Sequence, residues 1–375
     1  MSQLYLLPPE HMGEDDAYLS QQIITYIGNK RSLLPFIGKG IDIVRDRLSK
    51  KKLNTLDLFS GSGIVARYLK QYSNLVIAND LENYSKISNL CYLSNKESVD
   101  LDAVRDYQKK LNFSIEESLS PGFITELYSP KDEKNITKED RCFYTRRNAM
   151  FLDTARQQIE KIPSSLRVYF LAPLFSRASV HANTSGVFKG FYKNKDGKGQ
   201  YGGSGKDALT RILGKIELDI PVLSRFNCES KVYQGDSNKI IEEIEEVDVA
   251  YFDPPYNQHP YGSNYFMLNL LADYQRPVDT SRVSGIPINW NRSRYNQKKE
   301  AQTALFELVD KTKAKFILIS YNSEGFVSYD SFVSELKKRG IITVLETSYN
   351  TFRGSRNLHE RSIHVTEYLY LLEKK

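Results

Sequence analysis

Cysteine, histidine and tryptophan are scarce in this chain of 375 residues, which has three, five and one of them. The cysteines, Cys91, Cys142 and Cys228, stand far apart, and no pair has the short spacing typical of a zinc or redox site. An odd number of widely separated cysteines argues against a disulfide framework and favours a reduced setting. We therefore expect a cytoplasmic protein whose chemistry needs no metal.

Long apolar runs are also missing. None approaches the roughly 20 residues that a membrane-spanning helix needs, and residues 1–16 lack the basic-then-apolar pattern of a secretion signal. The excess of one charge is small, because 52 Lys and Arg face 46 Asp and Glu, a net charge of +6. This mild basicity is compatible with a polyanionic partner. The length predicts two domains, or one α/β domain with an insertion.

The most informative motif is Asp253-Pro254-Pro255-Tyr256, which follows the apolar run 247–252, typical of a buried strand in a parallel sheet. Open α/β folds bind ligands at the carboxyl ends of such strands. The Asp253 carboxylate and the Pro254 carbonyl can accept both N–H bonds of an aromatic amine such as adenine N6. Tyr256 offers a face for a base that has left the duplex. By itself the motif is equally compatible with methylation of such an amine and with a strand-ending turn, which uses the same residue types.

A second motif lies earlier in the chain. Residues 53–59 predict a strand, 60–63 a glycine-rich turn and 64–72 a helix, which together form half of a nucleotide-binding unit. Glycines let the backbone approach a ligand closely, and the start of a helix presents free N–H groups. A further strand over 75–78 leads to Asp80, where an acid commonly binds the ribose hydroxyls of an adenosine-containing cofactor.

The same segment fits another class of enzyme. Gly61, Gly63 and Ala66 have the spacing of the dinucleotide fingerprint, and Asp80 follows at the expected distance. By itself this segment is equally compatible with an NAD-dependent dehydrogenase. That enzyme would need a catalytic His or Lys in its cleft, and none of the five histidines has a convincing place.

The organisation of the chain changes after residue 83. Helical stretches predicted over 101–111, 146–162 and 167–179 alternate with polar loops until apolar strand patterns resume near residue 227. We interpret this region as an insertion into an α/β, Rossmann-like sheet. The expected boundaries are an N-terminal arm over 1–19, a sheet domain over 20–90 and 229–375, and an inserted, mainly helical domain over 91–228.

The insertion contains a glycine-rich, basic run over residues 193–206. Such a run could lie along DNA phosphates and become ordered on binding, or it could be a surface loop. It supplies Lys193 and Lys195 as candidate DNA contacts.

Together the pieces resemble the D12-class, Dam-like DNA adenine-N6 methyltransferases. Residues 26–30 look like the family's N-terminal cofactor motif, 57–63 like its methyl-donor loop and 253–256 like its catalytic tetrapeptide. They follow the family's order and, with further similar stretches, extend over nearly the whole chain outside the arm. The resemblance implies a Rossmann-like S-adenosylmethionine-dependent methyltransferase sheet with an inserted target-recognition domain.

The resemblance also implies roles for single residues. The catalytic residues are Asp253, Pro254, Pro255 and Tyr256. The residues that bind S-adenosylmethionine are Tyr26, Lys30, Asp57, Phe59, Ser60, Gly61, Ser62, Gly63, Asp80 and Asp236. The resemblance also places Tyr265 in the segment just after the tetrapeptide, as a candidate DNA contact. It does not match the insertion residue by residue, and there we nominate Arg177, Lys193 and Lys195, together with Arg353 near the C-terminus, as further DNA contacts.

The expected activity is methylation of adenine N6 in double-stranded DNA by base flipping, within a restriction-modification system that has a cognate endonuclease. A monomer is expected, because a flipping enzyme can act on one strand at a time. Cytosine-N4 or RNA amine methylation would use the same acceptor geometry. A non-catalytic DNA-binding subunit would have no reason to keep both motifs.

Overall fold

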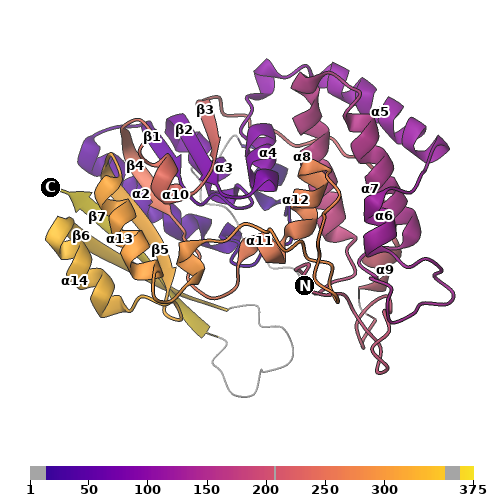
Figure 1. Cartoon of the computed structure of the whole chain (residues 1–375). Helices are drawn as coiled ribbons and strands as arrows, with labels where there is room; N and C mark the ends of the chain where they lie inside the picture. Colours follow the sequence, from indigo (N-terminus) through magenta and orange to yellow (C-terminus); the bar gives the residue numbers. More distant parts are fainter. Residues whose placement is uncertain (1–13, 207, 351–363) are drawn as a thin grey trace.

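The computed structural model describes residues 14–206, 208–350 and 364–375 (Figure 1). Within these residues a seven-stranded sheet has the order β3-β2-β1-β4-β5-β7-β6. Its strands are β1 (Leu53–Asp57), β2 (Ser73–Asp80), β3 (Glu229–Gln234), β4 (Val247–Phe252), β5 (Ala314–Asn322), β6 (Gly340–Asn350) and β7 (His364–Lys374).

The connectivity of the sheet places the ligand-binding edge. Strands β1 to β5 are parallel, whereas β7 runs antiparallel between β5 and β6. The chain moves outward from β1 to β2 and β3 and then returns to pair β4 with the other side of β1. Asp57 pairs in register with Tyr251, so the carboxyl ends of β1 and β4 lie side by side. Such a reversal point is where open α/β sheets bind ligands.

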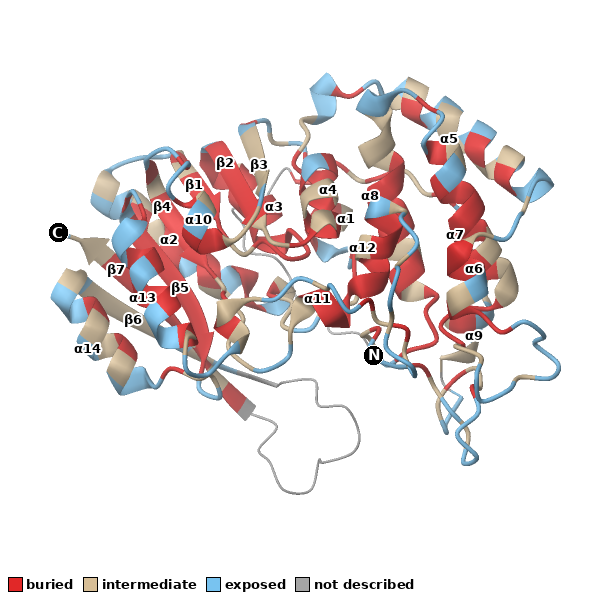
Figure 2. Ribbon diagram, viewed as in Figure 1, coloured by how far each residue is buried: buried red, intermediate tan, exposed pale blue. Residues whose placement is uncertain are grey.

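Both faces of the sheet are covered, which explains why its strands are apolar runs rather than alternating ones. One hydrophobic cluster joins alternate strand residues to α2, α3 and α4, and a second joins the other residues to α13 and α14. Figure 2 shows the buried strands between these layers. The helices are α2 (Leu34–Leu48), α3 (Ile64–Leu69), α4 (Asn83–Tyr92), α10 (Ser237–Ile240), α13 (Ala301–Lys311) and α14 (Tyr329–Arg339).

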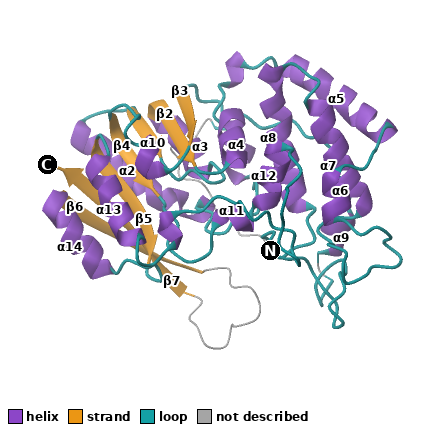
Figure 3. Ribbon diagram, viewed as in Figure 1, coloured by secondary structure: helices purple, strands orange, loops and turns teal. Residues whose placement is uncertain are grey.

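A mainly helical region lies beyond the β3 edge of the sheet (Figure 3). Helices between β2 and β3 build most of it, and α12, which follows β4, packs against α4 and α8. The Arg156 side chain bonds to the Leu271 carbonyl at 2.9 Å, so residues outside the interval 91–228 complete this region. Its helices are α5 (Leu101–Glu117), α6 (Phe123–Tyr128), α7 (Arg146–Ile159), α8 (Ser164–Val180), α9 (Leu209–Leu213), α11 (Tyr261–Asn264) and α12 (Phe266–Asp273).

Some local predictions differ from the structure. The described part of the expected N-terminal arm is not loose, because it forms α1 (Asp16–Ser20) and buries Tyr18, whose hydroxyl donates to the Tyr92 carbonyl at 2.6 Å. Asp236 caps α10, because its side chain accepts the Asn238 N–H. Short 3₁₀ helices lie at Arg31–Leu33, Lys70–Tyr72, Lys96–Ser98 and Arg294–Asn296.

The basic run beginning at Lys193 is also more ordered than expected. Lys193 pairs with Gly199 in a small antiparallel hairpin. At its tip, the Asn194 side chain accepts the N–H groups of Asp196 and Lys198, both at 3.0 Å. This part of the run therefore forms a defined turn.

The three cysteines are buried and unpaired. No helix within the described ranges is both long and apolar enough to cross a bilayer.

Candidate active site

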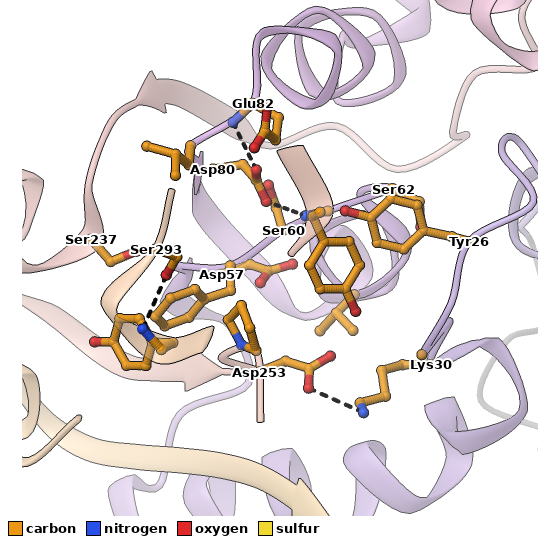
Figure 4. A pocket seen from close by; sticks show the side chains of 18 of the residues that line it. Tyr26, Lys30, Asp57, Ser60, Ser62, Asp80, Glu82, Ser237, Asp253 and Ser293 are labelled. Atoms are coloured by element: carbon orange, nitrogen blue, oxygen red, sulfur yellow. Dashed lines mark hydrogen bonds and ion pairs between the residues drawn. The ribbon is translucent and has the colours of Figure 1, made fainter. Parts of the chain in front are cut away.

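A pocket of about 860 Å³ lies where β1 and β4 end, at the reversal point of the sheet (Figure 4). This volume includes space that is open to solvent. Most of the residues that the sequence nominates for cofactor binding or catalysis line it. They are Tyr26, Lys30, Asp57, Phe59, Ser60, Gly61, Ser62, Asp80, Asp236, Asp253 and Pro255.

The glycine turn after β1 has a shape that only glycine adopts easily. Gly61 and Gly63 have φ angles of +53° and +77°, in the left-handed region. A Cβ on Gly61 would lie 2.9 Å from Tyr26 Cε1, and one on Gly63 would lie 2.7 Å from Asn89 Oδ1. The Gly61 N–H donates to Asp80 Oδ2 at 2.8 Å and so ties the turn to the end of β2. The turn and Tyr26 therefore fit each other closely around the pocket.

Asp57, the last residue of β1, presents an unsatisfied acceptor. Its Oδ2 accepts the Ala66 N–H at 2.9 Å, while its buried Oδ1 has no hydrogen-bond partner among the described residues. Burial raises the pKa of Asp57, and the nearby charge of Asp253 raises it further. A buried oxygen without a partner is unfavourable unless a ligand donates to it. Figure 4 shows Asp57 between Asp80 and Asp253, where an N–H group of a bound ligand could reach it.

Asp80 and Glu82 form an acidic end of the pocket. Asp80 Oδ1 accepts the Glu82 N–H at 2.9 Å, and each carboxylate oxygen keeps a further lone pair. The Glu82 carboxylate accepts the side-chain amides of Asn269 and Asn291. Burial, together with Asp80, raises the pKa of Glu82 to about 7 despite these two bonds. Glu82 was not nominated from the sequence, although its position two residues after Asp80 could have drawn attention to it.

Tyr26 belongs to a cluster of stacked tyrosines. Its ring stacks on Tyr265, with centroids 4.6 Å apart, and on Tyr261, with centroids 5.0 Å apart. Its hydroxyl lies 3.1 Å from that of Tyr84. Tyr265 has 0% exposure, and its hydroxyl accepts the Ile27 N–H at 2.7 Å. The prediction that Tyr265 contacts DNA does not fit this complete burial; the residue supports Tyr26 instead.

Asp253 follows β4 directly and lies at the other end of the pocket, with 17% of its side chain exposed. Its Oδ1 pairs with Lys30 Nζ at 3.1 Å, and the same Nζ lies 3.1 Å from Glu367 Oε1. Burial raises the pKa of Asp253 to about 6, against the opposing effect of Lys30. Burial lowers the pKa of Lys30, but the two carboxylates outweigh it and hold that pKa well above its ordinary value. At neutral pH the site therefore contains an ionised carboxylate and a charged ammonium.

The remaining residues of the tetrapeptide surround this carboxylate. Pro254 is buried, whereas Pro255 and Tyr256 are partly exposed. The Tyr256 ring packs edge-to-face on Tyr321, with centroids 5.9 Å apart, and its centroid lies 5.8 Å from Lys30 Nζ. Tyr256 is thus held beside the ion pair with part of its surface in reach of solvent.

The wall opposite the glycine turn comes from the loop before α13. Phe59 packs edge-to-face on Tyr295 of this loop, with centroids 5.0 Å apart. The Tyr295 hydroxyl in turn donates to Asn238 Oδ1 at 2.7 Å. No sequence motif marked these positions. The loop residues that line the pocket are Asn291, Ser293, Tyr295 and Asn296.

The nominated DNA contacts lie in different surroundings. Lys193 and Lys195 are exposed on the hairpin described above. Arg177, near the end of α8, is engaged in an ion pair with Asp219. Arg353 lies outside the described residues. In the described part of the chain, no group of three or more His, Cys, Asp or Glu side chains is placed to hold a metal ion.

Comparisons with known proteins agree with this geometry. The family model of the D12 class N6 adenine-specific DNA methyltransferases matches residues 26–334. The type II methyltransferase M.NlaIII of Neisseria lactamica is 30% identical over 362 residues, which cover 94% of this chain and 99% of that protein. M.CviAII, a type II methyltransferase of Paramecium bursaria Chlorella virus 1, is 27% identical, with 93% and 98% covered. M.FokI of Planomicrobium okeanokoites is 26% identical over 93% of this chain and 52% of its own length. The chain belongs to the D12 class N6 adenine-specific DNA methyltransferase family.

Proposed function

We propose that this protein transfers a methyl group from S-adenosylmethionine to N6 of an adenine that has left the DNA duplex. The observation that carries the proposal is one pocket that holds both motifs, with the glycine turn of β1 on one side and Asp253 on the other. A methyl transfer needs its donor and acceptor fixed in line, and a shared pocket provides that placement.

The residues of the pocket fit the cofactor. S-adenosylmethionine supplies an electrophilic methyl group carried on a sulfonium sulfur. The unsatisfied Oδ1 of Asp57 would accept an N–H of its ammonium group, and the glycine turn leaves room that a side chain would fill. Asp80 and Glu82 offer acceptors for the two ribose hydroxyls. Asp236 and Phe59 would flank the adenine of the cofactor.

On the acceptor side, the chain orients the amine rather than deprotonating it. The lone pair of adenine N6 is delocalised into the ring, so the free amine is a weak nucleophile. The Asp253 carboxylate and the Pro254 carbonyl accept its two N–H bonds and localise the lone pair on nitrogen. Tyr256 stacks on the base and replaces the neighbours that it had in the duplex. Asp253 need not be a strong base, because the amine sheds its proton after attack.

Two parts of the chain would hold the DNA. The exposed Lys193 and Lys195 on the hairpin would bind phosphates, which supply much of the affinity for DNA. In the opposite loop, the Arg292 guanidinium stacks on Trp290 at 4.3 Å from the ring centroid. Because the intervening Asn291 lines the pocket, this pair lies beside the pocket, where it would contact the strand that carries the flipped base.

The relatives named above are type II methyltransferases, and we extend that setting to this chain. Methylation of its recognition sequence would protect the DNA of a cell against a cognate endonuclease. The enzyme acts as a cytoplasmic monomer, since one subunit methylates one strand at a time.

The test is incubation with labelled S-adenosylmethionine and unmethylated genomic DNA, followed by nucleoside analysis of the product. We expect N6-methyladenine, and the sequence context of the label then reveals the recognition site. N4-methylcytosine would keep the mechanism and change the target base. Absence of transfer to both DNA and RNA would refute the proposal.

A further inference from the structure

Glu367 is a buried acid outside both motifs. It lies on β7 with 0% exposure and pairs in register with Asn322 of the neighbouring strand β5. Its Oε1 accepts the Ser320 hydroxyl and lies 3.1 Å from Lys30 Nζ. Its Oε2 is buried and makes no hydrogen bond to any residue that the structure describes. Burying a carboxylate with one oxygen unsatisfied is costly, so the position calls for an explanation.

Charge balance does not explain it. Lys30 is the cation of this group, and Asp253 alone would neutralise it at 3.1 Å. With Glu367 at the same distance from Nζ, two acids contact one ammonium in a buried place. A structure that needed only a stable ion pair would omit the second acid. The second acid is therefore better understood through the reaction.

We propose that Glu367 is a positioning residue for methyl transfer, which holds Lys30 against Asp253 and offsets the positive charge of Lys30 at the acceptor amine. The inference rests on the proposed role of Asp253. Glu367 does not touch the reacting atoms and acts through Lys30.

The chemistry of the transfer explains why this offset matters. The amine nitrogen forms a bond to the methyl carbon while the bond from that carbon to sulfur breaks, so positive charge passes from sulfur to nitrogen until the nitrogen loses a proton to solvent. The ammonium of Lys30, 3.1 Å from the carboxylate that binds this amine, opposes the new charge. Glu367 offsets this repulsion between the ammonium and the new positive charge. Lys30 can then still bind Oδ1 of Asp253, which leaves Oδ2 free to accept an N–H of the amine.

The groups that face Asp253 determine how its titration responds. Lys30 lowers the pKa of Asp253 and Glu367 raises it. Removing the charge of Glu367 therefore shifts the pKa of Asp253 to a lower value. The ionisable side chains around Asp253, from every element packed against it, are Lys30, Asp57 of β1, Tyr251 of β4, Tyr256, Tyr261 of α11 and Glu367 of β7.

The test compares Glu367→Gln with Glu373→Gln, a matched change on the same strand. Glu373 pairs with Arg47 at 3.2 Å and has 25% of its side chain exposed. We measure kcat, KM for both substrates, and the acidic limb of the pH profile with the full chain. For Glu367→Gln we expect kcat to fall roughly 10- to 100-fold, by analogy with lost supporting contacts in other active sites. We also expect little change in KM and an acidic limb displaced to lower pH, whereas Glu373→Gln should match the unsubstituted enzyme.

A second variant separates the effect of the position of the Glu367 carboxylate from the effect of its charge. Ser320→Ala removes the hydroxyl that donates to Glu367 but leaves its charge, so we expect a smaller loss of kcat and an unmoved acidic limb. Binding of S-adenosylhomocysteine, measured by calorimetry, reports that each variant has a folded pocket. The inference is overturned if Glu367→Gln keeps normal kcat, if it loses kcat with an unmoved acidic limb, or if it does not fold while Ser320→Ala keeps normal kcat. Absence of N6-methyladenine with the unsubstituted enzyme would instead overturn the proposed function.

Discussion

Replacing Gly61 by Ala tests whether the glycine turn forms the cofactor site. At a φ of +53° an L-residue incurs about 1–2 kcal/mol of backbone strain. The added Cβ would also lie 2.9 Å from Tyr26 Cε1, closer than side chains tolerate, so the Tyr26 ring must move.

The Tyr26 ring has little freedom to move, because it stacks on Tyr261 and Tyr265 and its hydroxyl meets that of Tyr84. Loss of one aromatic stack costs about 0.5–1.5 kcal/mol beyond the buried area. Together with the strain, Gly61→Ala should lower the free energy of unfolding by about 1.5–3.5 kcal/mol. The displaced ring would narrow the pocket, and we expect the Kd for the cofactor to rise about 10- to 100-fold, which corresponds to about 1.4–2.8 kcal/mol.

Gly197→Ala is the matched control. Gly197 has a φ of +80°, but a Cβ added there, on the remote hairpin, would meet no atom within 4 Å. It should show the backbone strain alone, about 1–2 kcal/mol, with unchanged cofactor binding. Calorimetric titration with S-adenosylhomocysteine and denaturant unfolding measure the two quantities. The reasoning would be refuted if Gly61→Ala bound the cofactor within about twofold of the unsubstituted protein, or if both variants weakened binding equally.

Three further predictions concern catalysis and DNA. Asp253→Ala should abolish methyl transfer, because Asp253 binds the amine. The calorimetric Kd for the cofactor should stay within about twofold of the value for the unsubstituted enzyme. Normal transfer by this variant would place the catalytic site elsewhere. In the unsubstituted enzyme kcat/KM should be level above pH 6 and should decrease as the pH is lowered below 6, since the pKa of Asp253 is about 6 and its ionised form accepts the amine. A kcat/KM that stays constant from pH 7 to pH 5 would contradict this. Joint replacement of Lys193 and Lys195 by Ala should reduce the slope of log affinity against log salt by about 1.8, as two phosphate contacts are lost. Replacing Lys110 of α5 by Ala is the control, and an unchanged slope in the double variant would remove the hairpin from the DNA interface.

Much of the fold and half of the site could be predicted from local sequence. The runs before Asp57 and Asp253 predicted strands that the structure contains, and strand direction in a parallel sheet brings both acids to one edge. The glycine turn was recognisable because positive φ angles restrict the residue type at Gly61 and Gly63.

The partners of these residues were not predictable in this way. The Glu82 carboxylate is held by hydrogen bonds from Asn269 and Asn291, which lie more than 180 residues later in the chain. Tyr265 follows the catalytic tetrapeptide closely, as a DNA contact might, yet the packing of Tyr26 buries it. No pattern in the sequence reports such contacts.

The family, the α/β sheet and the two motifs could be inferred from local sequence, because strand periodicity, turn chemistry and motif order are properties of neighbouring residues. Which charged side chains meet in the site depends on the packing of the whole sheet. Lys30, Asp253 and Glu367 come from three distant parts of the chain and meet because β7 inserts antiparallel beside β5. A buried charge acts through distance and exclusion of water, and both are set by the packing of the whole sheet.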